Sequence, residues 1–357
     1  MHPGIKKGLS ILLIVVSVVI VISVAFGNQE LGDAWAVVRK LDTGWLLGLL
    51  GCWFAYAFFD ALGSWLCLRK QGYSLPITRV FSITLIGFFY SNITPGASGG
   101  QPMQVSSLHR AGVPVGNGTT AVTIRLIANQ ATISMMALVL LLMNREFVYR
   151  QLEGAIWFVR IGWVVNAVVV PLVLMAVYKR NWLEKLIRGI LRLLVRIRLV
   201  RNEEDQWRRI SGILDTYQTA FRTLMRSPRE ILLQCLCSFI SLLALTGSIV
   251  FVYYAMGMRG TPWIHLLTLS VLLFISASYT PLPGASGAQE GGFLYYFRGI
   301  FTGGTIGLAL LVWRFFTYYL FIFVGLFTML LEKFTRRRSS PPGNPPPEKA
   351  EEASMPK

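Results

Sequence analysis

Charged side chains are scarce in this sequence. Only 14% of its 357 residues are Asp, Glu, Lys or Arg, and 54% are hydrophobic. Soluble domains carry about a quarter charged residues, so the composition excludes an ordinary soluble protein. Apolar runs of about 17 to 25 residues, the length that crosses a bilayer as a helix, recur as far as residue 331. The sequence therefore predicts an all-α polytopic membrane protein.

Histidine and cysteine are also few. The three histidines, at positions 2, 109 and 265, are too scattered for a histidine metal site. Residues 96–100 match the Gly-x-Ser-x-Gly nucleophile pattern, but the pattern needs a preceding strand and a histidine–acid pair that nothing here signals. The four cysteines lie in apolar runs without acidic or histidine neighbours, which argues against disulfides and metal binding. We expect no enzymatic activity, no cofactor and no metal.

Acidic residues number only half as many as basic ones, 17 against 34, and the net charge is +17. The basic residues lie between the apolar runs and near the C-terminus, with no soluble basic domain to carry them. This is the positive-inside bias of membrane proteins. We therefore expect no nucleic-acid partner.

One short stretch occurs twice. Residues 95–101 read Pro-Gly-Ala-Ser-Gly-Gly-Gln, and residues 283–289 read Pro-Gly-Ala-Ser-Gly-Ala-Gln. Proline and glycine at these points must break the helices that lead into them. The copies are 188 positions apart, and two arginines inside apolar runs, Arg125 and Arg314, are 189 apart, which indicates an internal duplication. The residues predicted to form the tips of the breaks are Pro95, Gly96, Gly99, Gly100, Pro283, Gly284 and Gly287.

Loop charge indicates how the apolar segments cross the membrane. If all eight crossed, the most basic segment, residues 179–229, would lie outside the cell. If residues 77–110 and 263–301 are instead re-entrant hairpins, every basic cluster becomes cytoplasmic. Six crossings then remain, three per repeat, so the two repeats are inverted in the membrane. The predicted crossings are residues 9–26, 43–68, 115–143, 156–178, 231–256 and 305–331, the first favoured over a cleaved signal peptide.

This topology defines the predicted domains. Residues 1–334 form the membrane domain, with repeat one at 5–155 and repeat two at 156–334. Within residues 179–229, Arg188, Arg192 and Arg196 follow at four-residue spacing beside leucine and isoleucine, which predicts an amphipathic helix on an anionic lipid surface. Residues 335–357 are rich in proline and glutamate and are expected to be a disordered cytoplasmic tail.

Arg125 and Arg314 are the main candidate site residues. An arginine inside a span costs about 2.5 to 3.5 kcal/mol on insertion scales, so a compensating interaction is required. One interpretation is that both bind a phosphate, whose oxygens match the guanidinium fork. The other is that they form structural pairs, for example with Asp60 or Glu290. These interpretations are compatible.

Other polar residues at the breaks are further candidates. Glu290 is expected either to cap the helix that it opens or to titrate a proton. The first copy has Pro102 at the equivalent place, so its nearest polar residue is Gln101. Side chains that could bond a head group, or merely complete the turns in the case of the serines, are Gln101, Gln289, Ser98 and Ser286.

The paired breaks resemble those of a known family. After residues 95–101 a short helix leads to His109 and Arg110, and the second copy extends over residues 281–290 as Pro-Leu-Pro-Gly-Ala-Ser-Gly-Ala-Gln-Glu. In these features residues 9–331 resemble the lysylphosphatidylglycerol synthase transmembrane, or flippase-like, family. The resemblance implies a bacterial or archaeal cytoplasmic membrane protein related to the lipid-translocating half of the multiple peptide resistance factor. That factor has an aminoacyl-transferase domain after its membrane part. A short tail stands there in this chain, so we expect no synthase activity.

Three functions follow as hypotheses. The leading one is translocation of a phosphate-bearing membrane lipid, or a lipid-linked precursor, between leaflets. The alternatives are an ion-coupled transporter of a small anionic solute and a non-transporting membrane scaffold. Lipid is the expected substrate, both termini are expected on the cytoplasmic side, and no oligomeric state is assigned.

Overall fold

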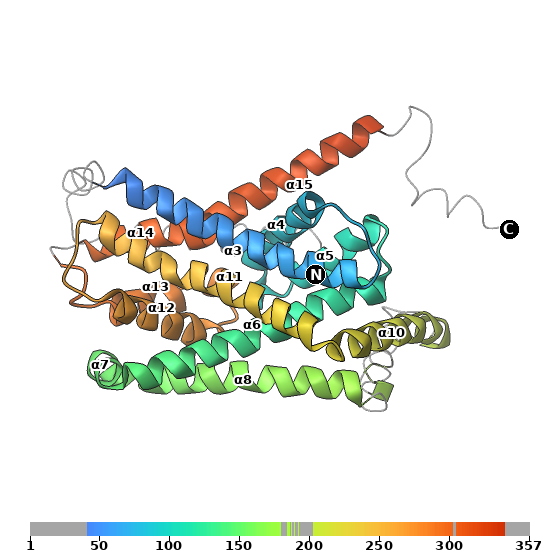
Figure 1. Cartoon of the computed structure of the whole chain (residues 1–357), viewed down its shortest axis with the longest axis horizontal. Coiled ribbons are helices and arrows are strands. Elements are labelled where there is room, and N and C mark those ends of the chain that lie inside the picture. Colours follow the sequence, from blue (N-terminus) through green and yellow to red (C-terminus); the bar gives the residue numbers. More distant parts are fainter. Residues whose placement is uncertain are drawn as a thin grey trace.

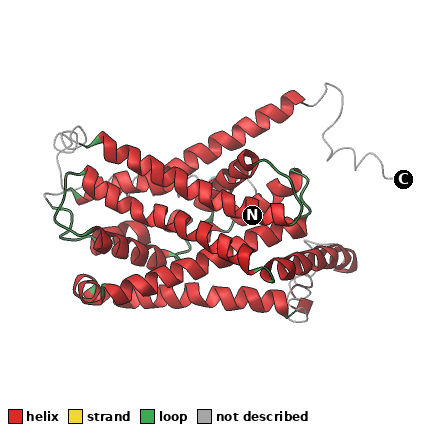
Figure 2. Ribbon diagram, in the orientation of Figure 1, coloured by secondary structure: helices red, strands yellow, loops and turns green. Residues whose placement is uncertain are grey.

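The computed structural model describes residues 41–179, 184, 185, 187, 189, 192, 203–302 and 305–339. Within these residues every regular element is a helix and there is no strand (Figure 2). The predicted all-α class is therefore confirmed for the described part of the chain. The predicted first crossing, residues 9–26, lies outside it.

Five helical segments of the described chain are long and apolar enough to cross a bilayer. They correspond to the five predicted crossings that follow residue 40. The last one is interrupted by a π-helical turn, Phe315–Tyr319, directly after Arg314. The segments are α3 (Thr43–Lys70), α6 (Val115–Met143), α8 (Ile156–Tyr178), α11 (Pro228–Ala255) and α14 (Ile306–Arg314) continued by α15 (Leu320–Ser339).

Each predicted hairpin is a pair of shorter helices joined at the duplicated stretch. The first pair is α4 (Ile77–Ile93) and α5 (Gly100–Arg110), and the second is α12 (Trp263–Ala277) and α13 (Ala288–Tyr296). α4 has 17 residues, at the lower limit for a full crossing, and α12 has 15, below that limit. In Figure 1 the first pair lies in the right half of the molecule and the second in the left half.

Two long helices form the centre of the molecule. α3 and α11 pack along their length (Figure 1). Glycines allow the close approach, because a Cβ on Gly48 would lie 2.4 Å from the Phe251 ring and one on Gly63 would lie 2.5 Å from Gln234 Nε2. Small residues commonly serve this purpose between membrane helices.

Each hairpin is held by a long helix from the other half. α4 packs against α15, where a Cβ on Gly325 would lie 2.5 Å from the Leu85 carbonyl oxygen. α12 packs against α6 and also against α8, where a Cβ on Gly162 would lie 2.3 Å from the Ile275 carbonyl oxygen. α6 and the α14–α15 segment carry the two duplicated arginines, so the packing scheme follows the duplication.

The amphipathic insert differs in part from its prediction. Its described helix is α10 (Glu203–Met225), which packs against α6. Phe221 of α10 is fully buried, and the Thr120 hydroxyl of α6 donates to the Tyr217 carbonyl of α10 at 3.1 Å. The apolar face of α10 therefore packs on protein and not on lipid. The basic pattern around Arg188 falls mostly outside the described residues, so its predicted contact with anionic lipid stays a prediction.

The C-terminal boundary also differs. α15 continues to Ser339, so its last five residues, 335–339, fall within the segment expected to be the tail. Residues 340–357 lie outside the described residues.

Candidate substrate site

The two tips share the backbone conformation of their Gly-Ala pairs and differ at the residues that follow, where Gly99 has φ of −83° and Gly287 has +86°. Gly96 and Gly284 have φ of +57° and +58°, and the alanines that follow them also have positive φ, +54° for Ala97 and +51° for Ala285. Alanine in this region costs about 1 to 2 kcal/mol. Such strain persists only where surrounding structure imposes it and often marks functional sites.

The tip serines complete the turns. Ser98 Oγ donates to the Pro95 carbonyl at 2.9 Å, and Ser286 Oγ donates to the Pro283 carbonyl at 2.8 Å. These bonds agree with the interpretation in which the serines complete the turns. Ser98 is exposed and Ser286 is buried, so the tips differ in their surroundings although each serine makes the same bond.

The tips contact each other. The Gly96 N–H donates to the Pro281 carbonyl at 3.0 Å, which links a residue of the first hairpin to the approach of the second. The Tyr318 hydroxyl donates to the Asn92 carbonyl at 3.0 Å, so the segment after Arg314 also reaches the first hairpin. These bonds satisfy backbone groups near both helix breaks within the protein.

Arg125 joins three helices. Its Nη1 donates to Asp60 Oδ2 on α3 at 2.5 Å, and its Nη2 donates to Gln104 Oε1 on α5 at 2.6 Å. Asn129 Nδ2, one turn along α6, lies 3.4 Å from Asp60 Oδ1. Arg125, Asp60 and Gln104 are all buried. The arginine therefore ties the first hairpin to α3 and α6.

Arg314 binds the second tip. Its Nε and Nη2 both lie close to Glu290 Oε1, at 2.8 and 2.7 Å, and Nη2 donates to the Gly284 carbonyl at 3.2 Å. Glu290 Oε2 accepts the Gly287 N–H at 2.6 Å, which caps the first turn of α13. Glu290 thus has the predicted capping geometry, and its titration stays a prediction.

The two ion pairs are not equivalent under the duplication. At the 188-residue offset, the position of Asp60 is occupied by Ser248 and that of Glu290 by Pro102. Arg125 is therefore paired with an acid from a neighbouring long helix, whereas Arg314 is paired with an acid from the hairpin of its own repeat. Both pairs correspond to the structural interpretation, and the predicted binding of substrate stays a prediction.

The predicted glutamines occupy different environments. Gln101 is exposed, and its side chain forms no hydrogen bond with a described residue. Gln289 is 7% exposed, and its Oε1 has no hydrogen-bond partner among the described residues. The residue that the sequence analysis missed is Gln104, one turn beyond Gln101. It fits because Gly87 on α4 leaves room, since a Cβ there would lie 2.2 Å from Gln104 Nε2.

A large cavity lies beside the second hairpin. Its volume is about 590 Å³, within the range of small-molecule sites. It opens at the surface between α8 and α12, where Phe158 is 57% and Tyr279 is 38% exposed. None of the predicted site residues lines it. Its lining consists of Gly154, Ala155, Phe158, Ser276, Ala277, Tyr279, Thr280, Ala288, Gly291, Gly292, Tyr295 and Tyr296.

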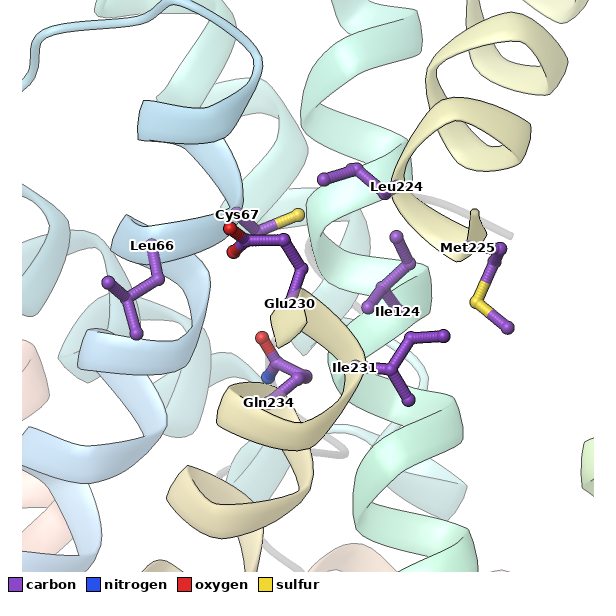
Figure 3. Close-up of a pocket in the computed structure, with 8 residues that line it drawn as sticks. All are labelled: Leu66, Cys67, Ile124, Leu224, Met225, Glu230, Ile231 and Gln234. Carbon is purple, nitrogen blue, oxygen red and sulfur yellow. The ribbon is translucent and has the colours of Figure 1, made fainter. Parts of the chain in front are cut away.

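A second cavity, between α3, α6, α10 and α11, is too small for a substrate (Figure 3). Its volume of about 10 Å³ is close to the minimum for one water molecule. Glu230 and Gln234 of α11 face Cys67 of α3 across it (Figure 3). Glu230 lies 3.9 Å from Lys70, so its charge is partly balanced within the protein.

Comparison with known proteins assigns the chain to a family. A family model described as the lysylphosphatidylglycerol synthase TM region matches residues 9–325. The chain belongs to this family. It is also 23% identical to a UPF0104 membrane protein of Archaeoglobus fulgidus over 325 aligned residues. The alignment covers 89% of this chain and 97% of the relative.

The family match confirms the resemblance inferred from the duplicated stretch. The matched region contains both tips and both arginine–carboxylate pairs, and it extends to residue 325 within α15. A member of the lysylphosphatidylglycerol synthase transmembrane family with several apolar helices is a multi-pass membrane protein.

Proposed function

We propose that this protein is a flippase-like translocase that moves a phosphate-bearing lipid, or a lipid-linked precursor, between the leaflets of a cytoplasmic membrane. The observation that carries the proposal is the meeting of two strained helix breaks beside two buried arginines. Paired broken segments in a duplicated membrane protein are typical of transport sites near the bilayer midplane.

In the proposed architecture the two halves form an inverted repeat, each with three crossings and one re-entrant hairpin. The placement of the hairpins in opposite halves of the molecule supports this arrangement (Figure 1). So does the basic charge around the first hairpin: Arg69, Lys70, Arg79 and Arg110 flank it, and these would face the cytoplasm. Under this arrangement residues 144–153 face the opposite side.

The large cavity favours a lipid over a small solute. A small anion must be enclosed during transport, whereas a lipid keeps its acyl chains in the bilayer and needs a lateral opening. The cavity beside α13 opens next to exposed apolar side chains, Phe158 and Tyr279, that a bilayer would contact. The ion-coupled alternative called for a closed cavity and is therefore less well supported.

In the proposed mechanism the polar head group passes between the hairpins while the acyl chains remain in lipid. At least one of the two arginines supplies positive charge for the phosphate. Asp60 and Glu290 balance that charge when no substrate is present, because an unpaired buried arginine would be strongly destabilising.

A translocation assay in liposomes tests the proposal. Protein is reconstituted with a fluorescent phosphatidylglycerol, and the rate at which label becomes accessible to a membrane-impermeant quencher is measured. We expect wild type to exceed protein-free liposomes, and a variant with Arg125→Ala and Arg314→Ala to lose the excess. Arg150→Ala, at an exposed pair with Glu146, is the matched control and should retain it. Wild-type protein that moves no lipid would refute the proposal and favour the scaffold alternative, which the paired arginines also allow.

A further inference from the structure

The two duplicated arginines differ in how completely they are engaged. A guanidinium has five N–H donors. Arg125 gives one bond to each of two partners, and no described residue accepts from its Nε. Arg314 makes three contacts, and Glu290 occupies its Nε–Nη2 edge, one of the two guanidinium edges that can bind an anion in a bidentate manner.

The surroundings strengthen this difference. The guanidinium of Arg314 lies 5.1 Å from the centre of the Tyr318 ring and 5.6 Å from that of Trp313, so aromatic side chains cover it. The Arg125 side chain is 10% exposed, against 4% for Arg314. An incoming anion therefore meets fewer obstacles at Arg125.

The first tip is also the more open one. Residues 95–98 and Gln101 are exposed, whereas Pro283, Ser286 and Gln289 of the second tip are buried. α5 is exposed at Gln101 and Pro102 near its start and at His109 and Arg110 at its end, and the residues between are intermediate or buried. Gln104, one turn after the exposed Gln101, contacts Arg125 directly.

We infer that the two arginines have separate roles: Arg125, with Gln104, binds a phosphate anion that arrives from the exposed first tip, and Arg314 is a positioning residue that holds the second tip. This division rests on the proposed function for the identity of the ligand. The ligand chemistry is a phosphate mono- or diester, carried by a lipid head group or by a free anion. Arg314 acts through Glu290 and the Gly284 carbonyl, and it does not touch the ligand.

Two charge-neutral double variants separate the roles. Asp60→Asn with Arg125→Gln, and Glu290→Gln with Arg314→Gln, each remove one arginine without leaving its acid unpaired in the protein interior. Ligand binding is measured in detergent as the rise in melting temperature caused by dihexanoylphosphatidylglycerol or by inorganic phosphate, since a ligand that binds only the folded state stabilises it.

For wild type we expect dihexanoylphosphatidylglycerol to raise the melting temperature in a saturable way. The Asp60→Asn/Arg125→Gln variant should lose this rise. Without ligand, the Glu290→Gln/Arg314→Gln variant should have a lower melting temperature than wild type. It should keep the ligand-induced rise. Its half-saturating concentration should lie within about twofold of the wild-type value, which is a change in binding free energy of less than RT ln 2. A rise that inorganic phosphate reproduces, and that depends on Arg125, would support the role of Arg125 and make a free anion the ligand.

The positioning role of Arg314 needs its own readout. A cysteine at Ser286, which is 9% exposed, reports on the second tip in a background without the four native cysteines. Its maleimide labelling should become several-fold faster in the Glu290→Gln/Arg314→Gln variant and stay unchanged in the Asp60→Asn/Arg125→Gln variant. In the binding assay, the division of roles is overturned if ligand binding is lost on removal of Arg314, retained on removal of Arg125 or absent in wild type. In the labelling assay, it is overturned if the cysteine at the second tip reacts at the same rate in both variants. None of these measurements requires translocation, so they can succeed or fail independently of the proposed function.

Discussion

Tyr318 lies directly against Gly284, the glycine at the second tip. A Cβ on Gly284 would lie 2.0 Å from the Tyr318 ring, and the same tyrosine donates its hydroxyl hydrogen to the Asn92 carbonyl of the first hairpin at 3.0 Å. One aromatic side chain from the segment after Arg314 therefore touches both hairpins. The contact places the two tips and the duplicated arginine in one rigid arrangement.

Gly284→Ala should destabilise the protein more than the same change at the first tip. Both glycines have φ near +57°, so each alanine carries a similar backbone penalty of about 1 kcal/mol. At Gly284 the methyl group also collides with Tyr318, and overpacking adds about 1 to 3 kcal/mol. Gly96, with nothing within 4 Å, is the matched control. Denaturant unfolding in detergent measures the loss in free energy of unfolding for both variants. Equal losses would show that the Tyr318 ring moves aside without cost.

Loss of the Asp60 carboxylate should be costly. Asp60→Ala leaves Arg125 buried without its counter-ion, and breaking a buried pair in this way costs about 3 to 5 kcal/mol. Thermal unfolding in detergent at constant lipid content measures the effect. Glu146→Ala is the control, because its pair with Arg150 is exposed and 3.9 Å long, and exposed pairs contribute little. A similar melting temperature for both variants would mean that water or lipid solvates Arg125 in the folded state.

The two glutamines of α5 should behave differently. Gln104→Ala removes a buried acceptor from Arg125 and should destabilise the protein by about 1 to 3 kcal/mol. Gln101→Ala alters an exposed side chain and should leave stability within about 0.5 kcal/mol of wild type. The same unfolding measurement compares them. A larger loss at Gln101 would indicate that Gln101, and not Gln104, is the residue that supports the first hairpin.

These glutamines show what could be predicted from sequence and what could not. The bounds of α6, Val115–Met143, were predicted residue for residue, because a proline precedes the apolar run and a polar link follows it. The helix breaks followed equally from proline and glycine. Gln104 could not be predicted, because its place depends on Gly87 of another helix.

The partners of the arginines were predicted only as examples among alternatives. Asp60 lies 65 positions before Arg125 and Glu290 lies 24 before Arg314, so local periodicity cannot relate them. The duplication suggested equivalent sites, yet it places Ser248 and Pro102 where the acids would stand. The different roles inferred for the two arginines arise from tertiary contacts that the repeat does not conserve.

α10 should be held by protein contacts and not by lipid. Phe221 is fully buried against α6, and truncating a buried phenylalanine costs about 3 to 5 kcal/mol. Phe221→Ala should therefore detach α10 and expose it to protease, in liposomes with or without anionic lipid. Arg222→Ala, next in the chain and exposed, is the control and should leave the protease pattern unchanged. Protection of the Phe221→Ala variant by anionic lipid alone would show that the membrane surface holds this helix.

The proposed inverted topology makes a prediction for two exposed positions. Glu146 lies on α7 (Arg145–Gln151), at the left end of the view in Figure 1, and Arg222 lies on α10 at the right end. If the hairpins enter from opposite faces, single cysteines at these positions lie on opposite sides of the membrane, with Arg222→Cys on the cytoplasmic side among the basic residues. In intact cells an impermeant maleimide should label only Glu146→Cys, and Arg222→Cys should react only after the membrane is opened.

That labelling also separates the two ways of counting crossings. If α4–α5 crossed the membrane completely, the chain would return to the opposite face before α6, and Glu146 would then lie in the cytoplasm. Labelling of Glu146→Cys only in opened membranes would therefore refute the re-entrant hairpin. A cysteine at Asp42, exposed just before α3, should label with Glu146→Cys, because α3 ends at the basic residues Arg69 and Lys70 that face the cytoplasm in the proposed arrangement. Agreement of these positions would fix the orientation of the first half independently of any transport assay.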